Sequence, residues 1–136
     1  MIVLDSSAII AFHNARDVHH RDAVELMEQV IVGSWGRALL LEYVVLEVAT
    51  VLMARRGLDA ATRVVTGLLE SREIDFVPCS DLFAATLDVF LRQGRGALSF
   101  TDAAIVVVAQ EMAAAVATFD VDFLAVPGIT VLPRGR

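Results

Sequence analysis

The sequence predicts an α/β protein in which a parallel sheet lies between two layers of helices. Short apolar runs at residues 2–5, 38–41 and 74–77 are continuous rather than alternating, and segments with apolar residues at helical spacing separate them. Continuous apolar strands are typical of parallel sheets that helices cover on both faces. Hydrophobic residues make up 57% of the 136 residues, so the chain has the apolar surface that such a core requires.

Helix boundaries in the first half of the chain follow from capping residues. Asp17 is expected to be the N-cap of a helix, because an Asp side chain accepts hydrogen bonds from the first helical turn. Gly57 is expected to close a helix, because glycine readily adopts the backbone conformation found at helix ends. The expected elements are a strand at 2–5, a helix at 7–13, a helix from Asp17 to about Val32, a strand at 38–41, and helices at 43–56 and 59–71.

Proline and glycine residues divide the second half of the chain. Pro78 ends a strand, and the segment 94–96, Gly-Arg-Gly, separates two helices. In parallel sheets, ligands bind beyond the carboxyl ends of the strands, where Asp5 and Asp120 are expected. The expected elements are a strand at 74–77, helices at 80–93 and 99–113, a strand at 115–118, a helical turn near 122–124 and a strand at 129–132.

Length and composition limit the possible classes of protein. We expect one domain, spanning residues 1–136, that is cytoplasmic and not inserted in a membrane, because the charge-free runs are too short to span one. The net charge of -6 argues against nucleic-acid binding through overall charge alone. All 11 basic residues are arginines, and the absence of lysine excludes P-loop nucleotide hydrolases. The single Cys79 is interpreted as a small core residue.

Four acidic residues occur at the ends of apolar runs or inside them: Asp5, Glu47, Asp102 and Asp120. Carboxylates are rarely buried unless they are paired or coordinate a cation. A shared cation therefore explains the four positions together, and it predicts that like-charged carboxylates crowd there. At least one of them is then expected to have a raised pKa in the absence of metal.

Each acid also has a purely structural interpretation. Asp5 and Asp120 fit helix N-caps, and Ser99 with Asp102 fits the spacing of a capping box. Glu47 is the hardest to explain in this way, because apolar residues surround it on nearly every face of its helix. Glu42, five residues earlier, is expected to face elsewhere.

Four segments, taken in order, resemble the PIN-domain ribonucleases, especially the VapC-type toxins of toxin-antitoxin pairs. They are Ile-Val-Leu-Asp-Ser-Ser at 2–7, the helix that carries Glu47, Leu-Ser-Phe-Thr-Asp-Ala at 98–103, and Thr-Phe-Asp-Val-Asp-Phe at 118–123. The resemblance extends over the whole chain. It implies a three-layer α/β/α, Rossmann-like PIN domain with a parallel sheet of four or five strands.

The resemblance also implies the site and its chemistry. Asp5, Glu47, Asp102 and Asp120 match the acidic positions of the family and would be the catalytic residues and ligands of Mg²⁺ or Mn²⁺, with Asp122 as a further, weaker metal ligand. Such ions prefer oxygen ligands and keep several waters. The implied reaction is hydrolysis of RNA phosphodiester bonds that leaves a 5′-phosphate and a 3′-hydroxyl. The implied partners are the RNA substrate, a cognate antitoxin and a second copy of the chain in a homodimer.

Two other functions remain open. One is a PIN-like module that binds RNA or protein without catalysis, and the other is a metal-dependent phosphohydrolase of small molecules. Metal-free RNA cleavage by His13, His19 and His20 is a rival mechanism, although His19 and His20 are interpreted as surface residues.

Ser6 and Thr118 are possible hydrogen-bond donors to the carboxylates, with strand-end and capping roles preferred. Other positions have two interpretations each: Arg92 and Arg95 (RNA backbone or solvated loop), Arg55 and Arg56 (helix-dipole partners rather than RNA ligands) and Trp35 (a lid over the core rather than a stacking contact).

Overall fold

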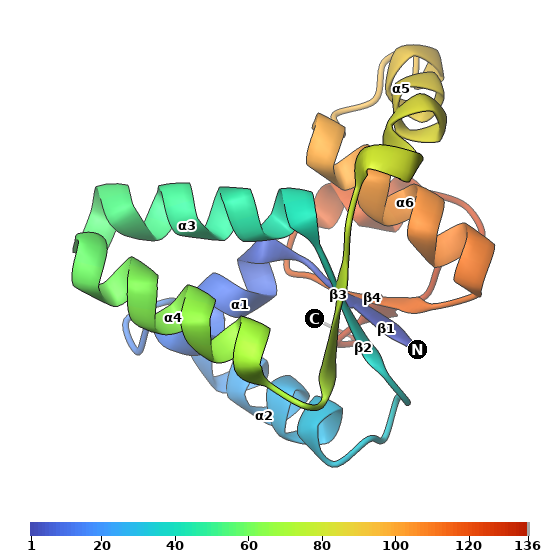
Figure 1. Ribbon diagram of the computed structural model, residues 1–136. Helices are drawn as coiled ribbons and strands as arrows, with labels where there is room; N and C mark the ends of the chain where they lie inside the picture. Colours follow the sequence, from blue (N-terminus) through green and yellow to red (C-terminus); the bar gives the residue numbers. More distant parts are fainter. Residues whose placement is uncertain (136) are drawn as a thin grey trace.

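Five short strands form an all-parallel sheet at the centre of the computed structural model, which describes residues 1–135 (Figure 1). The order across the sheet is β3-β2-β1-β4-β5, so the first strand of the chain lies in the middle. Sheet register places Ile2 of β1 opposite Ala38 of β2 and Ala115 of β4. The strands are β1 (Ile2–Leu4), β2 (Ala38–Leu41), β3 (Ile74–Val77), β4 (Ala115–Ala117) and β5 (Val131–Leu132).

Helices cover the sheet from two sides, which confirms the predicted three-layer α/β/α arrangement. In Figure 1 the first four helices lie to one side of the strands and the last two to the other. The helices are α1 (Ser6–His13), α2 (His20–Ile31), α3 (Glu42–Arg56), α4 (Leu58–Glu70), α5 (Phe83–Arg92) and α6 (Phe100–Met112), with short 3-10 helices η1 (Ser80–Leu82) and η2 (Val121–Ala125).

The core follows from the continuous apolar strands. Every residue of β1, β2 and β4 is buried, as expected for strands with helices on both faces. The edge strand β3 differs, because Asp75 and Phe76 are exposed there. Asp75 forms an ion pair with Arg37, which places charge on an edge that would otherwise pair with another strand. In the part of the chain that the structure describes, no helix is long and apolar enough to cross a membrane.

Two predicted helix starts were wrong. The second helix begins at His20, because the Asp17 carboxylate instead accepts a hydrogen bond from the backbone N–H of His19, 2.8 Å away, in a turn that precedes the helix. The expected helix at 80–93 is divided, since the backbone N–H of Leu82 donates to the carbonyl of Cys79 at 3.0 Å and closes a tighter 3-10 turn before α5. The final strand is also shorter than predicted.

The carboxyl ends of β1 and β4 meet at one edge of the sheet. Leu4 pairs with Ala117, and the backbone N–H of Asp5 donates to the carbonyl of Ala117 at 3.0 Å. The segments that continue these strands, Asp5–Ser7 and Thr118–Asp120, therefore begin side by side. Because α3 follows the carboxyl end of the neighbouring strand β2, its first turns lie at the same edge.

Candidate active site

Asp5 is buried at the end of β1, with only 3% of its surface exposed. Its Oδ2 accepts hydrogen bonds from the hydroxyl groups of Ser7 and Thr118, both at 2.7 Å. Asp5 occupies the N-cap position of α1, but its side chain makes no capping hydrogen bond to that helix. The cap interpretation therefore does not explain this carboxylate. Two hydroxyl groups, one after β1 and one after β4, hold it in place instead.

Ser7 is a positioning residue that the sequence analysis missed. Its Oγ donates to Asp5, lies 3.1 Å from Oγ1 of Thr118 and accepts a hydrogen bond from the backbone N–H of Phe119 at 3.0 Å. It thus joins the segments that follow β1 and β4. The available signal was its place two residues after Asp5, where a short hydroxyl side chain can bond back to the strand end.

Glu47 comes to this edge from α3 through Ser6. The Ser6 hydroxyl donates to Oε1 of Glu47, and the Glu47 side chain is partly buried. Glu42 accepts from the backbone N–H of Cys79 at 2.9 Å and faces elsewhere, as predicted. The sequence analysis named Ser6 and Thr118 as possible hydrogen-bond donors to the carboxylates. Both hydroxyl groups do donate to the predicted acids.

Asp102 combines the two roles that its sequence context allowed. Its Oδ2 accepts from the backbone N–H of Ser99 at 3.0 Å, and Ser99 Oγ accepts from the backbone N–H of Asp102 at 3.1 Å, which completes the capping box of α6. The carboxyl group is nevertheless buried. Burial first, and the charges of Asp5 and Asp120 in addition, raise its pKa to about 6, against the opposing effect of the hydrogen bonds from Ser99.

Asp120 lies in the turn between β4 and η2. Its backbone N–H donates to Oγ1 of Thr118, and its Oδ1 accepts from the backbone N–H of Asp122, both at 2.9 Å. Asp120 is therefore the cap of η2 that its sequence position also allowed. The charge of Asp120 is the main cause of a raised pKa at Asp122, which places the two carboxylates close together.

The structure brings these acids together at the carboxyl ends of the strands, but it does not arrange them as a complete set of metal ligands. The charges of Asp5 and Asp120 contribute to the raised pKa of Asp102, so these three carboxylates lie near one another. Glu47 joins through Ser6, beside Asp5. Within residues 1–135, however, no three His, Cys, Asp or Glu residues are arranged to hold one ion together. Mg²⁺ commonly uses one or two carboxylates with several waters, and the metal-binding role of each acid stays a prediction.

No basic side chain among residues 1–135 forms an ion pair with these acids. The ion pairs among residues 1–135 join Arg37 to Asp75 and Arg92 to Asp88, and neither includes an acid of this edge. Hydroxyl and backbone N–H donors hold the carboxylates instead. A partly buried set of oxygen ligands with negative charge left over suits a hard divalent cation.

The histidines differ from their surface interpretation. His19 is partly buried and its ring stacks on Phe119, with centroids 4.5 Å apart, while Nδ1 of His20 lies 2.8 Å from the carbonyl oxygen of Ala11. Among the hydrogen bonds of residues 1–135, none joins a histidine ring to Asp5, Asp102 or Asp120. This arrangement gives no support to an acid-base pair of histidines at the acidic edge, which is the carboxyl end of the sheet that carries Asp5, Glu47, Asp102 and Asp120.

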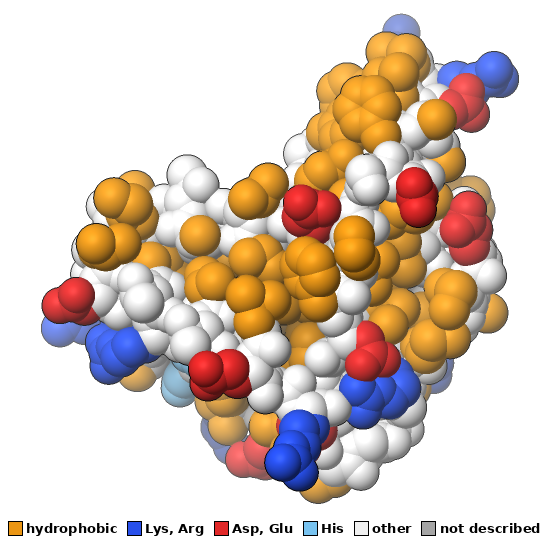
Figure 2. All heavy atoms as spheres, in the orientation of Figure 1, with side chains coloured by type: hydrophobic (Ala, Val, Ile, Leu, Met, Phe, Trp, Pro, Cys, Tyr) orange, Lys and Arg blue, Asp and Glu red, His pale blue; other side chains and the backbone are white. Residues whose placement is uncertain are grey.

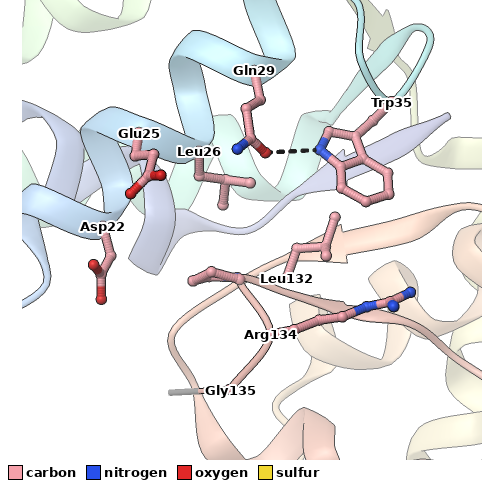
Figure 3. A pocket seen from close by; sticks show the side chains of 9 residues that line it. Asp22, Glu25, Leu26, Gln29, Trp35, Leu132, Arg134 and Gly135 are labelled. Atoms are coloured by element: carbon pink, nitrogen blue, oxygen red, sulfur yellow. Dashed lines mark hydrogen bonds between the residues drawn. The ribbon is translucent and has the colours of Figure 1, made fainter.

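A separate cavity of about 430 Å³ lies between α2 and the residues after β5 (Figure 3). Trp35 borders it, packs partly against the core and donates from Nε1 to Oε1 of Gln29 at 3.3 Å. This position agrees with the predicted role of Trp35 as a lid over the core. Asp22 and Glu25 also line the cavity, whereas the four predicted site acids do not.

Comparisons with known proteins agree with the α/β/α fold. The sequence profile of the PIN domain matches residues 2–129. A VapC ribonuclease of Archaeoglobus fulgidus is 28% identical over 123 residues, which are 89% of this chain and 78% of that protein. The structure of VapC20 of Mycobacterium tuberculosis, described as a toxin that cleaves the sarcin-ricin loop, superposes with a TM-score of 0.81 and 26% identity over 92% of this chain and 94% of that one.

A further similar structure, VapBC2 of Rickettsia felis bound to a promoter DNA fragment, shares the fold with a TM-score of 0.71. It is 14% identical over 96% of this chain and 97% of that one. The profile match covers nearly all of the described residues. The chain therefore belongs to the PIN-domain family.

Proposed function

We propose that the chain is a metal-dependent RNA endonuclease that acts as the toxin of a toxin-antitoxin pair. The observation that carries this proposal is the set of partly buried, unneutralised carboxylates at the carboxyl ends of β1 and β4. The similarity to a VapC ribonuclease and to an RNA-cleaving toxin supports RNA as the substrate. Cleavage of RNA by the purified chain tests the proposal, and RNA left intact in the presence of Mn²⁺ would overturn it.

Each residue of the site has a distinct task in this proposal. Asp5, fixed by Ser7 and Thr118, and Asp120, fixed by the turn after β4, supply oxygen ligands on a rigid edge. Asp102 keeps one oxygen in the capping box, and Glu47 and Asp122 complete the acidic rim. A bound Mg²⁺ or Mn²⁺ would lower the pKa of a water and offset negative charge on the scissile phosphate. The products would then carry a 5′-phosphate and a 3′-hydroxyl.

The antitoxin is proposed to neutralise this site with a basic side chain. A groove of about 330 Å³ beside Glu47 is lined mainly by apolar groups of Tyr43, Leu46, Val51 and Phe100. An amphipathic segment that fills this groove would place an Arg or Lys against the acidic edge, where a charge-assisted bond is strong. A structure of similar fold that was solved as a toxin-antitoxin complex supports the existence of such a partner.

Expression of the chain alone is expected to arrest bacterial growth, and co-expression of the small protein encoded beside it is expected to restore growth. The reason is that RNA cleavage stops when the partner covers the acidic edge. Colony counts after induction measure both effects. The Asp5→Asn variant serves as the control and should be harmless, whereas arrest by that variant would show that toxicity does not require the site.

A second copy of the chain is proposed to cover the exposed apolar surface. Figure 2 shows hydrophobic side chains gathered over α5 and across α3 and β3. On α5, Phe83 is 51% exposed and Leu91 is 69% exposed, although both are large and apolar. Light scattering should give a dimer for the wild type and a monomer for Leu91→Glu, because a buried charge opposes association. A dimeric Leu91→Glu variant would place the interface elsewhere.

A further inference from the structure

Three arginines surround a cavity at the end of the molecule that lies away from the sheet. The cavity has a volume of about 530 Å³ and lies between the carboxyl ends of α1 and α3. Its lining includes Arg16, Arg55 and Arg56, together with His13 and Asn14, and contains no acidic residue. In a chain with a net charge of -6, such a local concentration of positive charge calls for an explanation.

Only one of these arginines makes a side-chain hydrogen bond within the part of the chain that the structure describes. Arg56 donates from its guanidinium to the carbonyl oxygen of His13 at 2.7 Å and so caps the last turn of α1. The side chains of Arg16 and Arg55 are exposed and make no hydrogen bond or ion pair within residues 1–135. The helix-dipole interpretation made from sequence therefore covers Arg56 and, at most, Arg55. It leaves Arg16, in the loop after α1, without a role.

Burial of the imidazole and, in addition, the positive charge of Arg56 lower the pKa of His13. The histidine therefore stays uncharged near neutral pH and leaves the three guanidinium groups as the charged lining of the cavity. Guanidinium groups present planar pairs of N–H donors that match phosphate oxygens. The volume falls in the range of sites that hold small ligands.

Two helices connect this cavity to the acidic edge. Ser6 at the start of α1 bonds Glu47 of α3, and His13 at the end of α1 accepts from Arg56 of α3. At 1.5 Å per residue, the cavity therefore lies about 11 Å from the Ser6 contact along α1 and about 14 Å from Glu47 along α3. In Figure 1, α3 runs from the sheet toward its corner with α4, so the two sites lie at opposite ends of this helix.

We propose that the cavity lined by Arg16, Arg55 and Arg56 binds a backbone phosphodiester of the RNA substrate, a few nucleotides from the bond that is cut. This assignment rests on the proposed ribonuclease function and adds a substrate contact outside the acidic edge. A phosphate contact of this kind positions the strand without reading its sequence. It also gives an acidic protein a local positive surface that can hold an RNA strand.

The test compares two double variants that lose the same charge. Arg16→Gln with Arg55→Gln alters the cavity but keeps the Arg56 bond to α1, whereas Arg63→Gln with Arg72→Gln alters exposed arginines on and after α4. For an RNA long enough to reach the cavity, the cavity variant should raise KM about tenfold with kcat unchanged. The slope of log binding constant against log salt concentration should become shallower by about 0.7, since one phosphate contact to a single strand is lost. The control variant should match the wild type.

A dinucleotide substrate and a binding assay separate this inference from the ribonuclease proposal. A dinucleotide is too short to reach the cavity, so all variants should cleave it equally. Two results would overturn the inference while the ribonuclease proposal stands. In the first, the wild type cleaves the longer RNA and both double variants have the same KM. In the second, the cavity variant also loses kcat on the dinucleotide. Fluorescence anisotropy in EDTA reports RNA binding alone. If no protein cleaves RNA but the cavity variant binds RNA more weakly than the wild type, the cavity inference stands and the ribonuclease proposal is overturned. If no protein binds or cleaves RNA, both are overturned.

Discussion

Asp5→Asn is expected to reduce RNA cleavage about a thousandfold or more while the protein stays folded. The substitution keeps the volume of the side chain, and its amide oxygen can still accept from Ser7 and Thr118, which hold the carboxylate at 2.7 Å. The negative charge is lost, and with it several kcal/mol of the stabilisation that a cation site supplies. Single-turnover cleavage of a labelled RNA, with circular dichroism as the check on folding, measures the effect.

Three further substitutions extend this test to the other proposed ligands, with Asp122 and an exposed acid as controls. Glu47→Gln, Asp102→Asn and Asp120→Asn should each lose most activity, whereas Asp122→Asn should lose less, because its carboxylate lies farther along the turn. Glu28→Gln, on the exposed face of α2, is matched in chemistry to Glu47→Gln and should be fully active. Full activity in any two of the four folded site variants would contradict a shared site.

The second large effect is expected on stability, because the metal-free protein buries the carboxyl group of Asp102 and places it near the charges of Asp5 and Asp120. The pKa of Asp102 is about 6 against an ordinary 3.8, so its carboxyl group binds a proton more readily in the folded chain than in the unfolded one. Protonation of Asp102 therefore contributes its full stabilisation of the folded state below pH 3.8. This contribution is lost as the pH rises through about 6. The difference corresponds to about 3 kcal/mol.

Differential scanning fluorimetry in EDTA and in Mn²⁺ measures this effect. At neutral pH the Asp102→Asn variant should melt above the wild type in EDTA, since the amide keeps the capping box without the charge. Mn²⁺ should raise the melting temperature of the wild type by roughly 3–8 °C, from about 2.7 kcal/mol of linkage at roughly 100 times the dissociation constant. The variant should respond less. Equal responses in the two proteins would mean that Asp102 serves only as a helix cap.

The fold was predictable because its signals are local and redundant. Strand 74–77 was predicted with its observed bounds, and helix 43–56 differs from α3 by one residue, since Gly57 marks its end. The start of α2 was not predictable, because Asp17 fits both an N-cap and the turn that it forms with His19. Nothing in the local sequence distinguishes these two hydrogen bonds.

The acids that lie together at the carboxyl ends of the strands stood out in the sequence, but the contacts that hold them did not. The apolar surroundings of Asp5 and Glu47 mark them as unusual in sequence. The bridge that Ser7 makes to Thr118 crosses 111 positions of the chain and depends on β1 lying beside β4, which only the sheet order establishes. The arginine cavity was missed for the same reason: Arg16 and Arg55 come together through the packing of α1 against α3.

Cleavage of a labelled RNA by the purified chain in Mn²⁺, in EDTA, and in EDTA followed by excess Mn²⁺ tests the central claim most directly. The account predicts cleavage with Mn²⁺, none with EDTA and full recovery when the metal is restored, with products that carry a 5′-phosphate and a 3′-hydroxyl. Cleavage that persists in EDTA and leaves cyclic phosphate ends would contradict it, because that chemistry needs an acid-base pair such as histidine and no metal.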